Sequence, residues 1–203
     1  MSRIFTQAVT ALSLSELKKV VDSNPEIAEE VNEFELKYPK VPLSLIPVEI
    51  ESLYEYIVRD SHKVNIERSV PFTPFEKLLL AVLWKNGHID RVQSLMDGIS
   101  GVTKANTDFG VIFRQFGRSL VDESEPIVDQ HTIRAFCKFG DVSMVSSRKV
   151  IPRKSVFRNS DQPLINAYRQ WFKSILDKVP IGERAEFKYL LDKILFAVGK
   201  ALY

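Results

Sequence analysis

The sequence predicts an all-α protein. Apolar residues recur at the 3.6-residue spacing of a helix in one segment after another, most clearly over residues 183–202. Helix start and stop signals frame these segments, as in Thr73-Pro74 before one of them and Asn86-Gly87 after it. A hydrophobic content of 45% in 203 residues is ample for a core, and the length suits one large domain or a domain with an appended part.

The N-terminal third predicts helices separated by proline-containing breaks. Leu12, Leu17 and Val20 have helical spacing, and Asn24-Pro25 ends their segment. The prolines at positions 39 and 42 disfavour helix in the residues before them. We therefore expect helices over residues 7–21, 25–36 and about 44–59, with a linker at 38–42 and a loop at 60–71.

The clearest helix start lies at Thr73, where Pro74 and Glu76 complete a capping box. The helix that follows, over residues 75–85, is apolar nearly all round, so we expect it to be buried and central to the domain. Further helices are expected at residues 90–96, 104–120, 130–139, from 163 onward and 183–202, with a tight turn at 98–105 and a basic loop at 140–161 that hints at a short strand.

The charge is unevenly distributed although its net value is only +2. Residues 22–35 carry acids without a base, and residues 148–158 carry bases without an acid. Either run has an ordinary interpretation as a solvated face. The basic run has a second interpretation, a loop that faces the phosphates of a nucleic acid.

Several classes of protein are excluded or disfavoured by composition. Cys137 is the single cysteine, so the chain has no internal disulfide, no multi-thiolate metal site and no iron–sulfur cluster held by four cysteines. We expect neither a metal nor a cofactor. No apolar run reaches the roughly 18 residues that a membrane helix needs, and the N-terminus lacks the apolar core of a signal peptide. The default expectation is a cytoplasmic, soluble protein.

The most informative segment is residues 125–136, in which Ile127-Val128 lead to Asp129 at the expected start of a helix. Asp129 has two interpretations. It can cap the helix by accepting the N–H groups two and three residues later. It can also be a catalytic carboxylate that the helix dipole keeps ionised.

Three segments, in this order, resemble the helix-hairpin-helix DNA glycosylase superfamily, which includes endonuclease III, MutY and 8-oxoguanine glycosylase. The first is PFEKLLLAVLWKNGHID at residues 74–90, the second ISGVTKANTDFGVIFRQFG at 99–117, and the third IVDQHTIRAF at 127–136. The C-terminal segment is similar in layout to the last helices of that family. The resemblance covers roughly residues 72–203 and implies a glycosylase-like helical domain at 71–203, with a helical segment at 1–70 packed on it.

The resemblance implies an enzyme that flips a modified or damaged base out of double-stranded DNA and cleaves its bond to the sugar. Asp129 falls on the family's catalytic Asp, and Lys104 is a candidate nucleophile if the protein also has lyase activity. Lys104 lies one residue earlier than the family's Schiff-base Lys, and its other interpretation is a surface amine or a phosphate contact.

The remaining site residues follow by position. The expected DNA contacts are Gly101, Val102, Thr103, Arg114, Arg118, Arg148, Lys149, Arg153 and Lys154. The expected base pocket is formed by Trp84, Lys85, Asn86, His88 and His131, of which Trp84 can also be a core residue and His131 a capping group. We expect a monomer without a membrane partner. Two other functions are left open: a DNA-binding protein of the same fold without catalysis, and a helical protein-interaction module.

Overall fold

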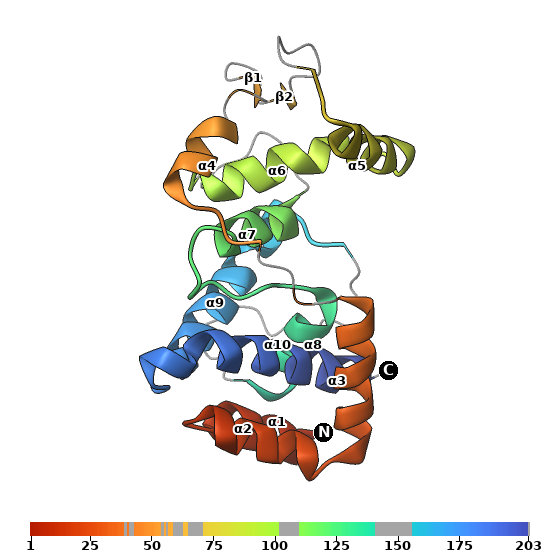
Figure 1. Cartoon of the computed structure of the whole chain (residues 1–203). Helices are drawn as coiled ribbons and strands as arrows, with labels where there is room; N and C mark the ends of the chain where they lie inside the picture. The colour runs from red at the N-terminus through yellow and green to blue at the C-terminus, as the bar shows by residue number, and fades with distance from the viewer. Residues whose placement is uncertain are drawn as a thin grey trace. The chain divides into compact units, whose positions relative to one another are not determined.

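The structure is a computed structural model, and it describes residues 1–38, 40, 43–53, 55, 57–58, 63–64, 71–101, 110–140 and 156–202. The chain forms two compact units. Unit 1 comprises Met1–Pro42 and Glu123–Tyr203, and unit 2 comprises Leu43–Asp122 (Figure 1). The sequence predicted a single boundary near residue 70. Unit 1 instead takes its residues from both ends of the chain, an arrangement that local patterns cannot reveal.

Unit 1 is built around its last helix. Its helices are α1 (Ser2–Thr10), α2 (Leu14–Asp22), α3 (Pro25–Lys37), α8 (Gln130–Phe139), α9 (Gln162–Leu176) and α10 (Arg184–Lys200), with short 3-10 turns at Asn159–Asp161 and Ile181–Glu183. Helix α10 contacts the other five helices in the described part of the unit. Its apolar face is fully buried, with Phe187, Leu191, Ile194, Leu195 and Val198 each at 0% exposure.

The first helix predicted for this unit, over residues 7–21, is wrong as a single element. Helix α1 ends at Thr10, and Ala11 is extended with φ −62° and ψ 134°. Ser13 then caps α2, because its side chain accepts a hydrogen bond from the N–H of Glu16. The helical spacing of apolar residues continued across the break at Ala11 because α1 and α2 both bury their apolar residues in unit 1.

Helix α3 is held against α10 by ion pairs as well as by packing. Lys200 pairs with Glu30 at 2.6 Å and lies 3.5 Å from Glu33. Lys193, only 2% exposed, pairs with Glu35. The acidic run predicted as a solvated face therefore places several of its carboxylates on the cations of α10.

Unit 2 contains four helices in its described residues, and two of them pack very closely. The helices are α4 (Pro47–Leu53), α5 (Pro74–Lys85), α6 (Ile89–Ile99) and α7 (Val111–Ser119), and the short strands β1 (Ile57–Val58) and β2 (Lys63–Val64) pair antiparallel. A Cβ on Gly98 would lie 2.0 Å from the carbonyl oxygen of Arg114, and a Cβ on Gly117 would lie 2.1 Å from that of Leu95. Glycine is therefore required on both helices for this α6–α7 contact.

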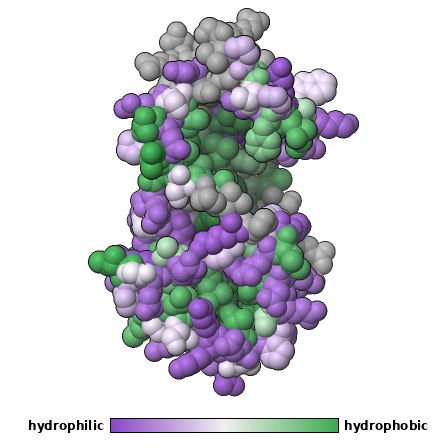
Figure 2. Space-filling model, viewed as in Figure 1, coloured by the Kyte–Doolittle hydropathy of each residue, from purple (hydrophilic) through white to green (hydrophobic). Residues whose placement is uncertain are grey.

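Helix α5 starts as predicted but is not buried. The Thr73–Glu76 capping box is present, with Glu76 Oε2 accepting from the N–H of Thr73 at 2.7 Å. No residue of α5 is buried in the structure. Its large apolar side chains are Phe75, Leu78, Leu79, Val82 and Trp84, which are 49–74% exposed, and apolar residues over α5 reach the surface (Figure 2). An all-round apolar helix can be a core helix or one that leaves much of its apolar surface exposed, and the sequence does not separate these cases.

Candidate functional site

Asp129 caps helix α8, as one of its two interpretations predicted. Its Oδ1 accepts hydrogen bonds from the N–H of His131 at 2.6 Å and of Thr132 at 2.8 Å. In return, the N–H of Asp129 donates to Thr132 Oγ1 at 3.1 Å, so the pair forms a capping box. The second oxygen, Oδ2, accepts no hydrogen bond from the described part of the chain. The capping interpretation is thus confirmed for one oxygen, while the catalytic interpretation stays a prediction.

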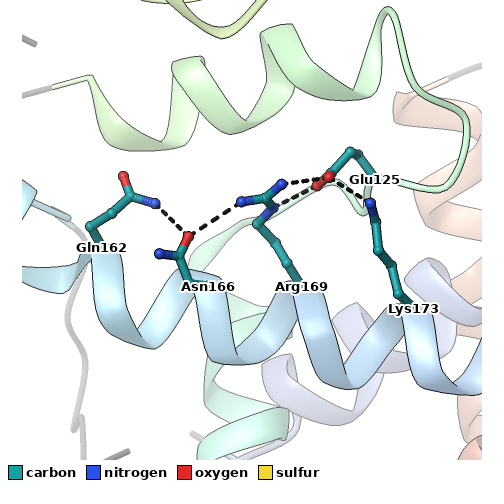
Figure 3. Close-up of polar contacts among 5 residues, drawn as sticks. All are labelled: Glu125, Gln162, Asn166, Arg169 and Lys173. Carbon is teal, nitrogen blue, oxygen red and sulfur yellow. Dashed lines mark hydrogen bonds and ion pairs between the residues drawn. The ribbon is translucent and has the colours of Figure 1, made fainter. Parts of the chain in front are cut away.

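The residues before Asp129, at positions 123–128, form a connecting segment that α9 holds through Glu125. The Glu125 carboxylate accepts from Arg169 Nε at 2.6 Å and Arg169 Nη2 at 2.5 Å, and it pairs with Lys173 Nζ at 2.9 Å (Figure 3). Asn166 Oδ1 in turn accepts from Arg169 Nη1 at 3.3 Å and from Gln162 Nε2 at 3.0 Å. The Glu125 side chain is only 5% exposed, so this bidentate pair fixes the backbone four residues before Asp129.

Helix α10 holds the same connecting segment at two further points. Lys188 Nζ donates to the carbonyl oxygen of Glu123 at 2.9 Å. One turn later, Asp192 accepts a hydrogen bond from the backbone N–H of Ile127. The segment is therefore tied to α9 by its buried carboxylate and to α10 by its backbone, which leaves Asp129 little freedom to move.

A small group of polar side chains surrounds the first turn of α8. Tyr168 from α9 is fully buried, and its hydroxyl faces Thr132 without reaching hydrogen-bond geometry. Asp192 from α10 has its Oδ1 closed off from solvent, and that atom has no hydrogen-bond partner among the residues that the structure describes. Both groups interact electrostatically with Asp129.

The two carboxyl groups are driven toward their neutral forms by burial. Burial raises the pKa of Asp129, against the opposing effects of its hydrogen bonds to Thr132 and His131 and of the His131 charge. The pKa of Asp192 is raised to about 8, first by burial and then by the negative charge of Asp129, while Lys188 opposes the shift. At neutral pH Asp192 therefore keeps its proton. Burial therefore opposes the ionised form of Asp129 that the catalytic interpretation expects at a helix start.

His131 lies against α10 instead of facing open solvent. Its ring is 4.6 Å from the ring of Phe196, and its Nδ1 is 3.2 Å from Arg134 Nη1. Burial lowers the pKa of His131, although the Asp129 charge and a hydrogen bond to the backbone of Gly199 oppose the change. A Cβ on Gly199 would lie 1.9 Å from the His131 carbonyl oxygen, so the first turn of α8 rests directly on α10.

The other predicted base-pocket residues belong to unit 2. Trp84 is 74% exposed near the end of α5, and Lys85 is exposed beside it. Asn86 follows α5 and donates from Nδ2 to the carbonyl oxygen of Val82 at 2.9 Å, and His88 precedes α6 without a side-chain cap. These four residues gather within unit 2, whereas Asp129 and His131 are in unit 1. Their convergence on one pocket stays a prediction.

The predicted DNA contacts are only partly described. Gly101 follows α6 with φ 71°, a left-handed conformation that favours glycine. Arg118 is half-buried in the last turn of α7. Arg114 is 3% exposed, beside Asp97, and burial lowers its pKa, so it does not present its guanidinium to a phosphate in this structure. Val102, Thr103, Lys104, Arg148, Lys149, Arg153 and Lys154 lie outside the described residues.

Sequence reasoning missed the residues that hold Asp129 in place. Arg169 and Lys173 follow Gln162 and Asn166 at helical spacing, so a polar stripe opposite the apolar face of α9 was a visible signal. The partner of that stripe, Glu125, lies 44 residues from Arg169 and gave no local signal. Asp192 looked like an ordinary polar residue of an amphipathic helix.

No family model matches the chain, and comparisons with curated proteins and with solved structures likewise find no match. Among the described residues, no three His, Cys, Asp or Glu side chains are grouped so that they could hold a metal ion. No described helix combines the length and apolar character needed to cross a bilayer.

Proposed function

We propose that the protein is a DNA N-glycosylase that acts on a modified or damaged base and uses Asp129 as its essential carboxylate. The observation that carries the proposal is the placement of Asp129 at the start of α8 on a connecting segment anchored by Glu125 and Asp192. The order of the three sequence segments that resemble the helix-hairpin-helix glycosylases supports the same assignment.

The chemistry needs a carboxylate with these properties. Cleavage of the bond between base and sugar develops positive charge on the sugar, as in the hydrolysis of other glycosides. A fixed negative group stabilises that charge most when it does not have to reorient during the reaction. In Asp129 the cap hydrogen bonds fix Oδ1, and Oδ2 is left to face the sugar or an attacking water. The base must first leave the DNA stack, as in other enzymes that modify bases.

The experiment is a base-release assay on duplexes that each carry one modified base. Asp129→Asn keeps a side chain that caps helices as well as Asp does, so the helix start is preserved while the charge is lost. We expect the wild type to release at least one base and Asp129→Asn to lose that activity by a factor of 100 or more, on the order of an electrostatic contribution of about 3 kcal/mol. Asp22→Asn, the same change at the exposed end of α2, is the matched control and should keep full activity. Equal activity of wild type and Asp129→Asn on every duplex would refute the proposal.

The exposed apolar side chains of α5 favour a second candidate, a helical module that binds another protein. A gel-shift titration on a duplex with an abasic site separates it from any DNA-binding function. Binding that weakens steeply with salt supports contact with DNA phosphates. Absence of binding at every salt concentration favours the interaction module. Salt-sensitive binding without base release favours a DNA-binding protein without catalysis.

A further inference from the structure

Helix α3 is held in unit 1 with little of its own surface buried. Of its 13 residues only Ile27 and Val31 are buried, the smallest buried share among the helices described in unit 1. Phe34 continues the same stripe one turn later, and its ring lies 4.9 Å from the ring of Phe196 on α10. Because so narrow a stripe removes little apolar surface from water, other contacts must contribute much of the docking of α3.

Those contacts are ion pairs with two lysines of α10. Lys200 Nζ donates to both carboxylate oxygens of Glu30, at 2.9 and 2.6 Å, and lies 3.5 Å from Glu33 Oε2. Lys193, whose side chain is 2% exposed, pairs with Glu35. At 3.6 residues per turn, Glu30 and Glu35 flank the apolar stripe of α3 on opposite sides. The ion pairs therefore close both edges of the contact between α3 and α10.

The docked position of α3 is transmitted to the first turn of α8. The Phe196 ring that meets Phe34 also lies 4.6 Å from the ring of His131. His131 in turn donates its backbone N–H to Asp129 Oδ1 at 2.6 Å. Through Phe196, α3 therefore supports the residue that contacts the carboxylate of Asp129.

We propose that α3, Pro25–Lys37, is a strap held on α10 by charge, which opens as one element when its ion pairs are screened and then loosens the Phe196–His131 contact beside Asp129. Ion pairs suit such a strap because salt weakens them, whereas it does not screen an apolar contact. Helices α8, α9 and α10 contact one another directly, so they stay packed when α3 leaves. Such a strap operates whether or not Asp129 acts on DNA, and it stands apart from the function proposed above.

The test is hydrogen–deuterium exchange of the intact chain, followed by mass spectrometry at about 0.01 M and about 1 M sodium chloride, where the Debye length is about 30 Å and about 3 Å. We expect the amides of α3 to exchange at least about tenfold faster at the higher salt concentration, because several weak ion pairs are lost together. The amides of α9 and α10 should keep their rates within about twofold. Equal rates for α3 at the two salt concentrations, or acceleration of all three helices together, would overturn the strap.

Two double variants separate the paired glutamates from the rest of the acidic helix. Glu30→Gln with Glu35→Gln weakens the pairing of both lysines and should bring α3 at low salt close to its exchange rate in the wild type at high salt. Glu26→Gln with Glu29→Gln removes the same charge at exposed positions that form no ion pair within the described part of the chain, and it should exchange like the wild type. Equal rates for the two double variants would contradict the proposal. If the first does not fold, the salt comparison on the wild type still decides it.

The link to the first turn of α8 has a readout of its own, the ring 1H NMR signals of His131. The chain has only three histidines, so these signals are few. They should shift when α3 opens, both in the wild type at high salt and in the Glu30→Gln, Glu35→Gln variant at low salt, because the neighbouring Phe196 ring is released. The variant at low salt controls for direct effects of salt on the imidazole. If α3 opens in the variant and the His131 signals do not move, the link between the strap and Asp129 is wrong.

Discussion

Replacing Glu125 with Gln should destabilise unit 1 strongly for so small a change. The substitution keeps the shape of the side chain but leaves Arg169 and Lys173 without their carboxylate. Removing one partner of a buried ion pair costs about 3–5 kcal/mol. Glu125 is 5% exposed, but Arg169 is 23% and Lys173 36% exposed, so water stabilises part of the freed positive charge. We therefore expect a loss of about 2–3 kcal/mol in the free energy of unfolding.

The measurement is urea unfolding followed by far-ultraviolet circular dichroism, with a thermal scan beside it. A loss of this size lowers the melting temperature by about 5–10 °C in a chain of this length. The control is Glu186→Gln, the same chemical change in an ion pair with Lys40 whose side chains are 56% and 55% exposed. Such exposed pairs contribute about 0–1 kcal/mol. If the two variants unfold within 0.5 kcal/mol of each other, an uncertainty on the order of the extrapolation itself, the connecting segment is not anchored through Glu125 as described.

Three further predictions concern the same region. In the folded protein Asp192 holds its proton up to a pKa of about 8, whereas the unfolded chain loses it near 3.8. The free energy of unfolding should therefore fall between those pH values, by up to about 1.4 kcal/mol per pH unit for this one group. Asp192→Asn should reduce this slope in urea titrations at a series of pH values and leave the part that the raised pKa of Asp129 contributes. Gly199→Ala should lower the free energy of unfolding by more than about 2 kcal/mol, because the added Cβ would lie 1.9 Å from the His131 carbonyl oxygen. The control is Gly182→Ala, whose added Cβ meets nothing within 4 Å and which should be nearly neutral in the same thermal scan. Asp129→Ala should lower the free energy of unfolding by about 0.5–2 kcal/mol because the helix cap is lost, whereas Asp129→Asn should lower it by only a few tenths of a kcal/mol. Equal losses for the two variants in urea unfolding would contradict the capping geometry.

The sequence predicted what depends on nearby residues. The capping box at Thr73, the cap at Asp129 and the end of α8 at Phe139 are each set by side chains within four positions, and all are confirmed. The apolar stripe of α10 was equally visible because its period is that of a helix.

The sequence could not predict what depends on distant partners. The exposure of α5 is decided by which helices pack on it, and the burial of Arg114 follows from the close α6–α7 contact that two glycines permit. In the candidate site, Asp129 was found from a local pattern, whereas Glu125, Tyr168 and Asp192 matter through contacts between helices. The same limit applies to the boundary of unit 1, whose two segments are separated by unit 2.

Because α10 contacts each of the other helices described in unit 1, these helices cannot complete their packing until the end of the chain has been synthesised. The ribosome releases α1, α2 and α3 long before α10, the helix against which they pack, so their apolar sides cannot be buried on α10 during most of translation. A stop codon ahead of residue 184 would leave unit 1 without its centre, and we expect such a fragment to be degraded or to aggregate. The last helix is therefore the part of unit 1 that tolerates truncation least.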